Sequence, residues 1–173
     1  MAFANIANRL GGVEPANVKT CINANAKTNN VRTAFAETAK KVVPGDICIF
    51  FINTHGGMFD GNGGKYAVLC MYDGYYEDEE LAQDIASMGS DVSIIGIVSA
   101  CHSGGLFDND SLSGDSIEWH LSNGLANCPL NVAWITSADA ATSSYGIFSK
   151  FLLDYGWSNG FAGEDGFSFL DLA

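Results

Sequence analysis

The sequence predicts an α/β fold with a mostly parallel central sheet, in one domain over residues 1–173. Apolar runs of strand length alternate along the chain with amphipathic segments, which is the order that a parallel sheet with helical crossovers requires. The run 47–52 is apolar throughout, as is typical of a central strand covered on both faces. With 173 residues, 47% of them hydrophobic, the chain can bury one good core but hardly two.

Residues 1–46 are predicted to form a helix, a short strand and a second helix. The first twelve residues place apolar side chains at helical spacing, and 18–22 is a candidate for a short strand. The second helix is expected to begin at Thr28, a residue type that caps helix N-termini, and to end before Pro44. Its apolar positions recur at intervals of three and four residues: Val31, Ala34, Phe35, Ala39 and Val42.

The remaining elements complete the predicted sheet. Two central strands, 47–52 and 92–98, flank a glycine-rich loop with a hairpin and then a short helix at 77–88 that is acidic at its start. A further strand is expected at 131–136, followed by a closing helix with an apolar stripe over 147–155. The polar segment 105–125 is long for a surface loop, so we expect it to be a lid or a processing site.

Charge excludes two classes of partner. Eight basic residues against twenty acidic ones give a net charge of −12, which repels phosphate backbones and anionic lipids. We therefore expect neither a nucleic-acid partner nor a membrane-surface partner. No apolar stretch reaches the roughly 20 residues that cross a bilayer, and no secretory signal is recognised. The compartment stays open.

The cysteines do not form the pattern of a disulfide framework. Their number is odd and no pair has the CxxC spacing of a metal site, so at least one thiol should be free. The five are Cys21, Cys48, Cys70, Cys101 and Cys128. Three of them, Cys21, Cys48 and Cys70, fall inside predicted strands, where burial is the expected role of a cysteine.

Cys101 and His55 are the candidate catalytic residues. Each stands just past the carboxyl end of a predicted central strand, and in open α/β sheets the ligand crevice lies outside those ends. A free thiol with a pKa of about 8.5 is only partly ionised at neutral pH, and an imidazole beside it assists its deprotonation. The same imidazole can then protonate a leaving amine. The pair therefore favours acyl transfer by a Cys-His dyad.

Glycines around both residues favour an oxyanion hole. His55 is followed by two glycines, and Cys101 by the sequence His-Ser-Gly-Gly. Small residues let a substrate backbone come close and leave main-chain amides free to point outward. We expect the amides of Gly56 and Cys101 to hold the oxyanion, each worth about 3 kcal/mol in the transition state.

These motifs resemble those of the caspase-like cysteine peptidase superfamily. Thr-His-Gly-Gly after a strand, and Ser-Ala-Cys-His-Ser-Gly-Gly after a second strand, are similar to the histidine and cysteine boxes of caspases, metacaspases and legumains. Residues 17–51 and 134–153 extend the likeness, which is closest in pattern to bacterial caspase or metacaspase homologues. The resemblance implies a caspase-like three-layer sandwich with helices on both faces of the sheet. It also implies a cysteine endopeptidase that forms a thioester on Cys101, acts on peptides or proteins and needs no organic cofactor.

One departure concerns the start of the domain. The family opens with a strand before its first helix, whereas this sequence begins at the helix. The sequence leaves open whether that strand is missing, is supplied by another segment, or is supplied through self-association. It also leaves open whether the chain is a truncated or processed form, with 105–125 as a site of self-cleavage.

The resemblance assigns a specificity pocket and a calcium site. Ser99, two residues before the nucleophile, and Ser137 at the next strand end should border the pocket, with Asp139 as its nearest acid. Metacaspases of basic specificity tend to place an acid where this chain has Ser99, so basic specificity is in doubt. Calcium would be bound by Asp78, Glu79 and Asp108, the acids that match the family's places, since carboxylates suit this ion.

Other interpretations compete with catalysis. The alternative from another class is an inactive caspase-fold scaffold or binding module, motivated by the absent first strand and by Ser99. His102 is adjacent to Cys101, and because neighbouring side chains of an extended segment point to opposite sides, we expect a structural role for it. His120 lies in the polar segment and is expected to be exposed. One remote histidine and no second spaced cysteine make zinc binding a poor explanation.

Overall fold

A computed structural model describes residues 13–61, 64–107, 131–144 and 148. The chain divides into two compact units, one formed by 1–20 with 145–173 and the other by Cys21–Ser144. In the first unit, the structure describes residues 13–20 and the helical residue Phe148. Residues 13–20 include a 3-10 turn, η1 (Pro15–Asn17). The sheets, the helices α2 and α3 and the candidate site described below belong to the second unit.

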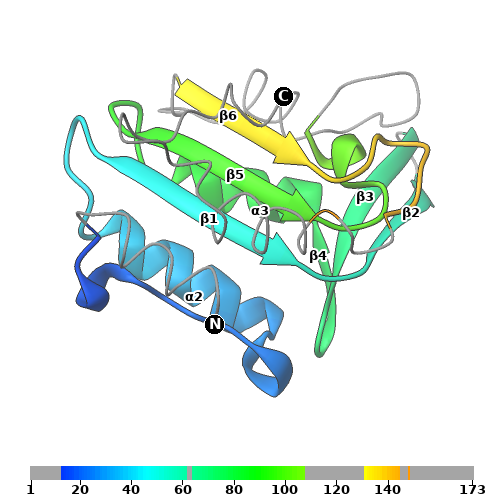
Figure 1. The fold of residues 1–173 in the computed structure, drawn as a ribbon, viewed down its shortest axis with the longest axis horizontal. Helices are drawn as coiled ribbons and strands as arrows, with labels where there is room; N and C mark the ends of the chain where they lie inside the picture. Colours follow the sequence, from blue (N-terminus) through cyan, green and yellow to red (C-terminus); the bar gives the residue numbers. More distant parts are fainter. Residues whose placement is uncertain (1–12, 62–63, 108–130, 145–147, 149–173) are drawn as a thin grey trace. The chain divides into compact units, whose positions relative to one another are not determined.

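A parallel sheet of three strands forms the centre of this unit. Its strands are β1 (Ile47–Asn53), β5 (Ser93–Ser99) and β6 (Asn131–Thr136), in the order β1-β5-β6 (Figure 1). The strands predicted at 47–52, 92–98 and 131–136 are thus confirmed, and so is the α/β class. Continuous apolar sequence suits these strands, because a strand inside the core can then be covered without burying polar side chains.

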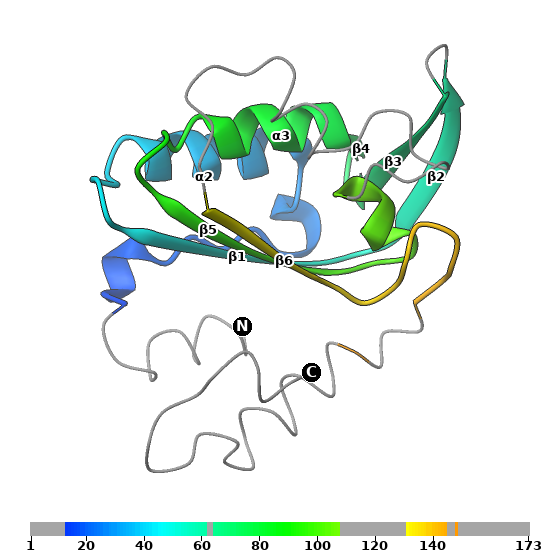
Figure 2. The ribbon, with the colours of Figure 1, turned by 90° about the horizontal axis from the view of Figure 1, so that it is seen from above.

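Two helices cover one face of the parallel sheet. They are α2 (Thr28–Ala39) and α3 (Asp78–Ala86), and Figure 2 shows both on the same side of β1, β5 and β6. The ring of Phe50 packs against this core, with its centroid 5.4 Å from that of Phe35 and 5.5 Å from that of Trp134. Gly96 pairs with Phe50, and a side chain there would lie within 2.7 Å of both rings. Gly96 therefore makes room for the aromatic core.

The opposite face of the sheet corrects one expectation. β1 was predicted to be covered on both faces, yet Ile47 is 64% exposed and Ile49 is 48% exposed. β1 is at one end of the strand order and not at its centre, and an edge strand need not be covered on both faces as a central strand is. Among the residues that the structure describes, both α-helices of the second unit belong to one layer, and a second helical layer, as the resemblance implied, is not among them.

A small antiparallel sheet follows β1. It contains β2 (Gly56–Gly61), β3 (Gly64–Met71) and β4 (Gly74–Glu77), in the order β2-β3-β4. The glycine-rich segment predicted as a loop with a hairpin is therefore mostly strand. Figure 1 shows this sheet beyond the arrowheads of β1 and β5. It thus stands beside the edge where the candidate catalytic residues lie.

The strand predicted at 18–22 is wrong. These residues belong to neither sheet and run between η1 and a second 3-10 turn, η2 (Asn23–Asn25). Asn23 adopts a positive φ of 52°, a conformation that interrupts an extended chain. The five residues also include Lys19 and Thr20, which leaves too short an apolar pattern to hold a strand.

Helix α2 begins one residue earlier than a cap at Thr28 would place it, with Lys27 at the N-cap position. Thr28 is the first helical residue and not the cap, and the Thr28 amide donates to Oδ1 of Asp73 at 3.0 Å. The Thr28 hydroxyl donates to the carbonyl of Tyr75. The helix N-terminus is therefore capped from the turn between β3 and β4, a tertiary contact that local sequence does not reveal.

Helix α3 is confirmed where the acidic segment predicted it. Glu77 and Glu80 form a reciprocal capping box at its start. Arg32 of α2 bonds to Glu80 at 2.7 Å and to Asp84 at 3.2 Å, and the hydroxyl of Tyr76 donates to Asp84. Burial raises the pKa of the Asp84 carboxyl above its ordinary value. The network holds α2, α3 and β4 together.

Three predicted segments lie wholly or mostly outside the described residues. They are the first helix, the closing helix over 147–155 apart from Phe148, and the segment 105–125 beyond Phe107. The start of 105–125 was expected at the surface, but Gly105 and Leu106 are buried in a 3-10 turn, η3 (Ser103–Leu106). In the part of the chain that is described, no helix has the length and apolar character needed to cross a membrane.

Candidate active site

The ends of β1 and β5 bring the two candidate catalytic residues to one edge. The strands are parallel neighbours in register, with Asn53 opposite Ser99, and the amide of Thr54 donates to the carbonyl of Ser99 at 3.1 Å. His55 and Cys101 each come two residues after the last paired position of their strands. The adjacency of the two strands, on which the predicted dyad depends, is therefore present.

Gly56 and Cys101 are in main-chain contact. A Cβ atom built on Gly56 would overlap the carbonyl oxygen of Cys101 and would lie 3.2 Å from the Cβ of Ala100. No flexible side chain is involved, so neither partner can make room for a substituent at position 56. The close approach requires glycine and fixes the first residue after His55 against the residue that carries the candidate nucleophile.

The amide of Gly56 points away from the neighbouring strand. Hydrogen-bonded pairs alternate along an antiparallel ladder, and the amide of Cys70 donates to the carbonyl of His55 at 2.8 Å. Gly56, which pairs with Leu69, is therefore a non-hydrogen-bonded position of the ladder. Its N–H points away from β3, at the edge of the antiparallel sheet, and is the donor that the expected oxyanion hole would use.

The thiol of Cys101 is half-buried and contacts the main chain of Ser144. The Ser144 amide donates to Sγ at 3.3 Å, and the thiol donates to the Ser144 carbonyl at 3.5 Å. His55 is exposed. The site therefore has an accessible imidazole and a sulfur atom that is held by a hydrogen-bonding main-chain segment.

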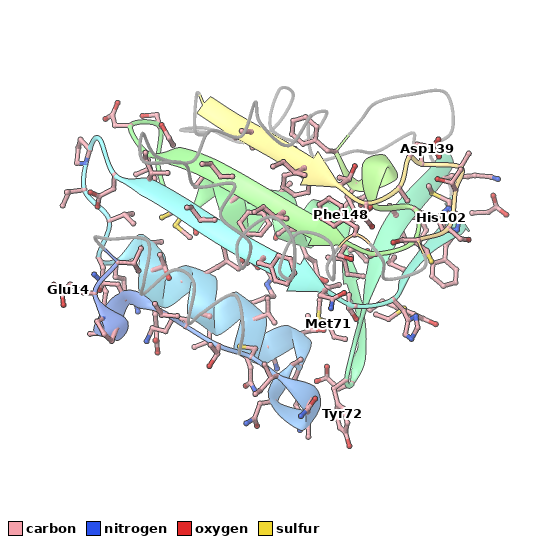
Figure 3. All side chains as sticks on the ribbon, viewed as in Figure 1. Glu14, Met71, Tyr72, His102, Asp139 and Phe148 are labelled. Atoms are coloured by element: carbon pink, nitrogen blue, oxygen red, sulfur yellow. The ribbon has the colours of Figure 1, made fainter. Side chains whose placement is uncertain are left out.

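A second main-chain clamp fixes the turn after the nucleophile. His102 adopts the left-handed conformation with φ 57°, and its amide donates to the carbonyl of Thr142 at 2.9 Å. Its ring nitrogen Nδ1 lies 2.9 Å from the carbonyl oxygen of Ala140, while the Gly104 amide donates to Ala138. Figure 3 shows His102 close to Asp139 of the opposing loop. These contacts agree with a structural role for His102.

The three predicted pocket residues differ in accessibility. Ser99 is 2% exposed, and the Ser137 hydroxyl is engaged with the main chain of Ala100, accepting at 3.1 Å and donating at 3.2 Å. Asp139 is exposed, and its Oδ1 accepts the amide of Ala141. Ser137 therefore holds the residue before the nucleophile, and Asp139 alone of the three presents a charge to solvent.

Two of the three predicted calcium ligands, Asp78 and Glu79, lie among the described residues. Asp78 is 2% exposed, and its two oxygens accept the amides of Ala67 and Glu79. Glu79 accepts a bond from Gln83, and Asp108 lies outside the described residues. Within the described ranges, no group of three or more His, Cys, Asp or Glu side chains is placed to hold a metal ion. Calcium binding stays a prediction.

Cys70 is a neighbour of the site that the sequence did not reveal. It was expected to be buried in a strand, but it is half-buried and lies opposite His55 in the antiparallel ladder. Burial, and then the charge of Cys101, raise the pKa of its thiol. The alternation of β3 contains the signal, because Leu69 faces the core and Cys70 must face the other way. Cys128 and His120 lie outside the described residues.

Comparisons with known proteins support the fold and leave the function open. No family model matches the sequence, and no curated protein matches it. The crystal structure of protein GSU0716 from Geobacter sulfurreducens is similar, with a TM-score of 0.61 and 21% sequence identity. The alignment covers 92% of this chain and 70% of that one. Similarity at this identity establishes a shared fold alone.

Proposed function

We propose that the protein is a cysteine endopeptidase of the caspase-like type, with Cys101 as nucleophile and His55 as general base and acid. The observation that carries the proposal is the adjacency of β1 and β5, whose carboxyl ends deliver both residues to one edge. The caspase-like three-layer sandwich is part of the same proposal. Its second layer of helices would cover the face on which Ile47 and Ile49 are exposed.

The proposed reaction has two steps. The sulfur of Cys101 attacks the carbonyl carbon of a peptide bond after its proton passes to His55, and the carbonyl oxygen becomes an oxyanion between the amides of Gly56 and Cys101. His55 then protonates the leaving amine, the C–N bond breaks and a thioester remains. Water, deprotonated by His55, attacks the thioester and releases the acid and the free thiol.

The Gly56 contact supports the oxyanion assignment. The amide of Gly56 points away from β3 and its Cα packs against the Cys101 carbonyl, and this contact between two main-chain segments supports the assignment. Main-chain donors that are fixed by a sheet and a clamped turn cost no reorganisation during the reaction. Ser137 and His102 then serve as positioning residues for the segment around Cys101.

One observation favours the inactive-scaffold alternative. The Cys101 thiol hydrogen-bonds with the main chain of Ser144, so a substrate carbonyl must approach a sulfur that already has partners. A scaffold protein would keep this contact permanently. A peptidase would exchange it for contacts with substrate.

Covalent labelling tests the proposal against this alternative. We expect a peptidyl chloromethyl ketone at pH 7 to label Cys101 faster than any other cysteine of the folded protein, and to add one equivalent fewer to folded Cys101→Ala than to wild type. Burial raises the pKa of Cys21, Cys48 and Cys70, so these thiols are less ionised at neutral pH and should react appreciably only under alkaline conditions. Peptide mapping by mass spectrometry assigns the adduct.

The same experiment has an internal contrast. Iodoacetamide, which carries no peptide, should label Cys101 more slowly than the peptidyl reagent at equal concentration if a substrate site surrounds the sulfur. An unlabelled Cys101, or labelling that spreads over Cys48 and Cys70 at pH 7, would favour the scaffold.

A further inference from the structure

Three aromatic side chains, two of them exposed, form a cluster on the antiparallel sheet. We call Phe59, Tyr66 and Tyr75 the aromatic patch. The ring centroid of Phe59 lies 5.0 Å from that of Tyr75 and 6.0 Å from that of Tyr66. Phe59 is 37% exposed and Tyr75 is 56% exposed. A contiguous group of exposed apolar side chains, unlike a single one, is typical of a binding surface.

Strand register places the aromatic patch on the same face as His55. Directly opposite residues of an antiparallel pair share one face. His55 lies opposite Cys70, and Cys70 pairs with Tyr75, which forms one row across the three strands. The alternate positions of β2 and β3 then place the pair Phe59 and Tyr66 on this face too. The aromatic patch therefore adjoins the catalytic histidine.

The middle row, between the row of His55 and the row of Phe59, lies beneath the Phe59 ring. Gly57 pairs with Val68, which is only 2% exposed although it lies on the outer face of the sheet. The Phe59 ring and a methyl group of Val68 each come within 3.5 Å of the point where a side chain at position 57 would begin. The missing side chain of Gly57 thus lets the Phe59 ring pack over the main chain, two strand positions from His55.

Charge argues for an apolar occupant. Glu77 is the third residue of the middle row. Its carboxylate takes part in the capping box of α3, where it accepts a hydrogen bond from the amide of Glu80. The remaining described residues of the face are aromatic, aliphatic, glycine or cysteine apart from His55. A side chain bound here therefore gains from burial rather than from an ion pair.

The direction of the peptide follows from the chemistry of His55. A general acid must reach the nitrogen of the leaving amine, so the part of the substrate that follows the scissile bond starts at His55. The main chain of Cys101 contacts Gly56, the first residue of β2, and Phe59 lies three residues further along the same strand. The main chains of His55 and Phe59 are four strand positions apart, which is about 13 Å at about 3.3 Å per residue, and the Phe59 ring reaches back to Gly57, two positions from His55. An extended peptide of about two to four residues covers that length.

We infer that the aromatic patch binds an apolar side chain, preferably aromatic, within the first four residues after the scissile bond of the peptide substrate. This inference rests on the proposed function and adds to it the side of the substrate that is selected. The selectivity resides in the antiparallel sheet rather than in the pocket around Ser99, Ser137 and Asp139.

Quenched fluorogenic peptides with one constant half and four varied positions after the scissile bond test the inference on the full chain. We expect wild type to prefer Phe, Tyr or Leu over Ser at one of these positions by about tenfold in kcat/KM. Phe59→Ser and Tyr75→Ser should reduce that preference to about twofold or less. Tyr75→Ser covers the case in which Phe59→Ser unfolds, because Tyr75 is the more exposed.

Tyr72→Ser is the matched control. Tyr72 is 67% exposed and lies at the tip of the β3–β4 turn, outside the aromatic patch (Figure 3). It should keep both the wild-type rate and the wild-type preference. Thermal melts check that each variant is folded.

Each result of this experiment has one meaning. Cleavage by wild type without selectivity after the scissile bond, or the same selectivity in both patch variants, overturns the inference and leaves the peptidase intact. A change of oligomeric state in the patch variants without a change of selectivity assigns the aromatic patch to contact between copies and also overturns it. No cleavage of any peptide by folded wild type contradicts the proposed function, and the inference with it.

Discussion

Cys101→Ala should lower peptide hydrolysis by at least about a thousandfold, because removing the nucleophile of a covalent mechanism abolishes the acyl-enzyme. Substrate binding should survive, since the side chain is half-buried and the main-chain donors stay in place. The measurement is kcat/KM on the fluorogenic peptides, together with peptide affinity by fluorescence anisotropy.

Cys21→Ala is the control for this substitution. Cys21 is half-buried and lies outside both sheets, so its removal should leave kcat/KM within about twofold of wild type. Equal activity in wild type and Cys101→Ala would show that any hydrolysis comes from a contaminant or from another residue.

Gly56→Ala has the second-largest expected effect. The new methyl group would meet the carbonyl oxygen of Cys101, which belongs to the main chain and cannot move aside without displacing the nucleophile. We expect a loss of about a hundredfold or more in kcat, comparable to the loss of one oxyanion donor, with a smaller change in KM. Thermal stability should also fall, because overpacking of a close contact costs about 1–3 kcal/mol.

Gly74→Ala separates this local effect from a general effect of replacing glycine in the antiparallel sheet. A side chain at Gly74 would have no atom within 4 Å, and its φ is not positive. Activity and melting temperature should stay close to wild type. A fully active Gly56→Ala would remove the Gly56 amide from the oxyanion hole.

The central strands and the site edge were predictable from sequence for one physical reason. Continuous apolar runs at 47–52 and 92–98 have few alternatives to burial in a sheet, and parallel neighbours must end at the same edge. The helix at 28–39 was likewise visible in its period. Local sequence was sufficient wherever burial alone decides structure.

Features decided by distant pairing were not predictable. The glycine-rich residues of β2 carry little strand propensity of their own and become strand by pairing with β3. The cap of α2 comes from Asp73, far along the chain. The neighbourhood of His55 with Cys70 and the aromatic patch also depends on register, and a one-residue slip would reverse the faces.

The exposure of Ile47 and Ile49 illustrates a further limit. An apolar run predicts that a strand can be buried on both faces, whereas its place in the strand order decides whether it is. The expectation at 18–22 failed for a related reason, since a few apolar residues without a partner strand do not form a sheet.

The joint action of His55 and Cys101 is tested most directly by kcat/KM of His55→Ala, Cys101→Ala and the variant that carries both. His55→Ala alone should lose about 10²–10⁴-fold, as expected for a general acid–base residue. The double variant should be no slower than Cys101→Ala alone, because residues that act as one unit are not additive. Wild-type activity in His55→Ala, or losses that multiply in the double variant, would contradict a dyad at the shared edge of β1 and β5.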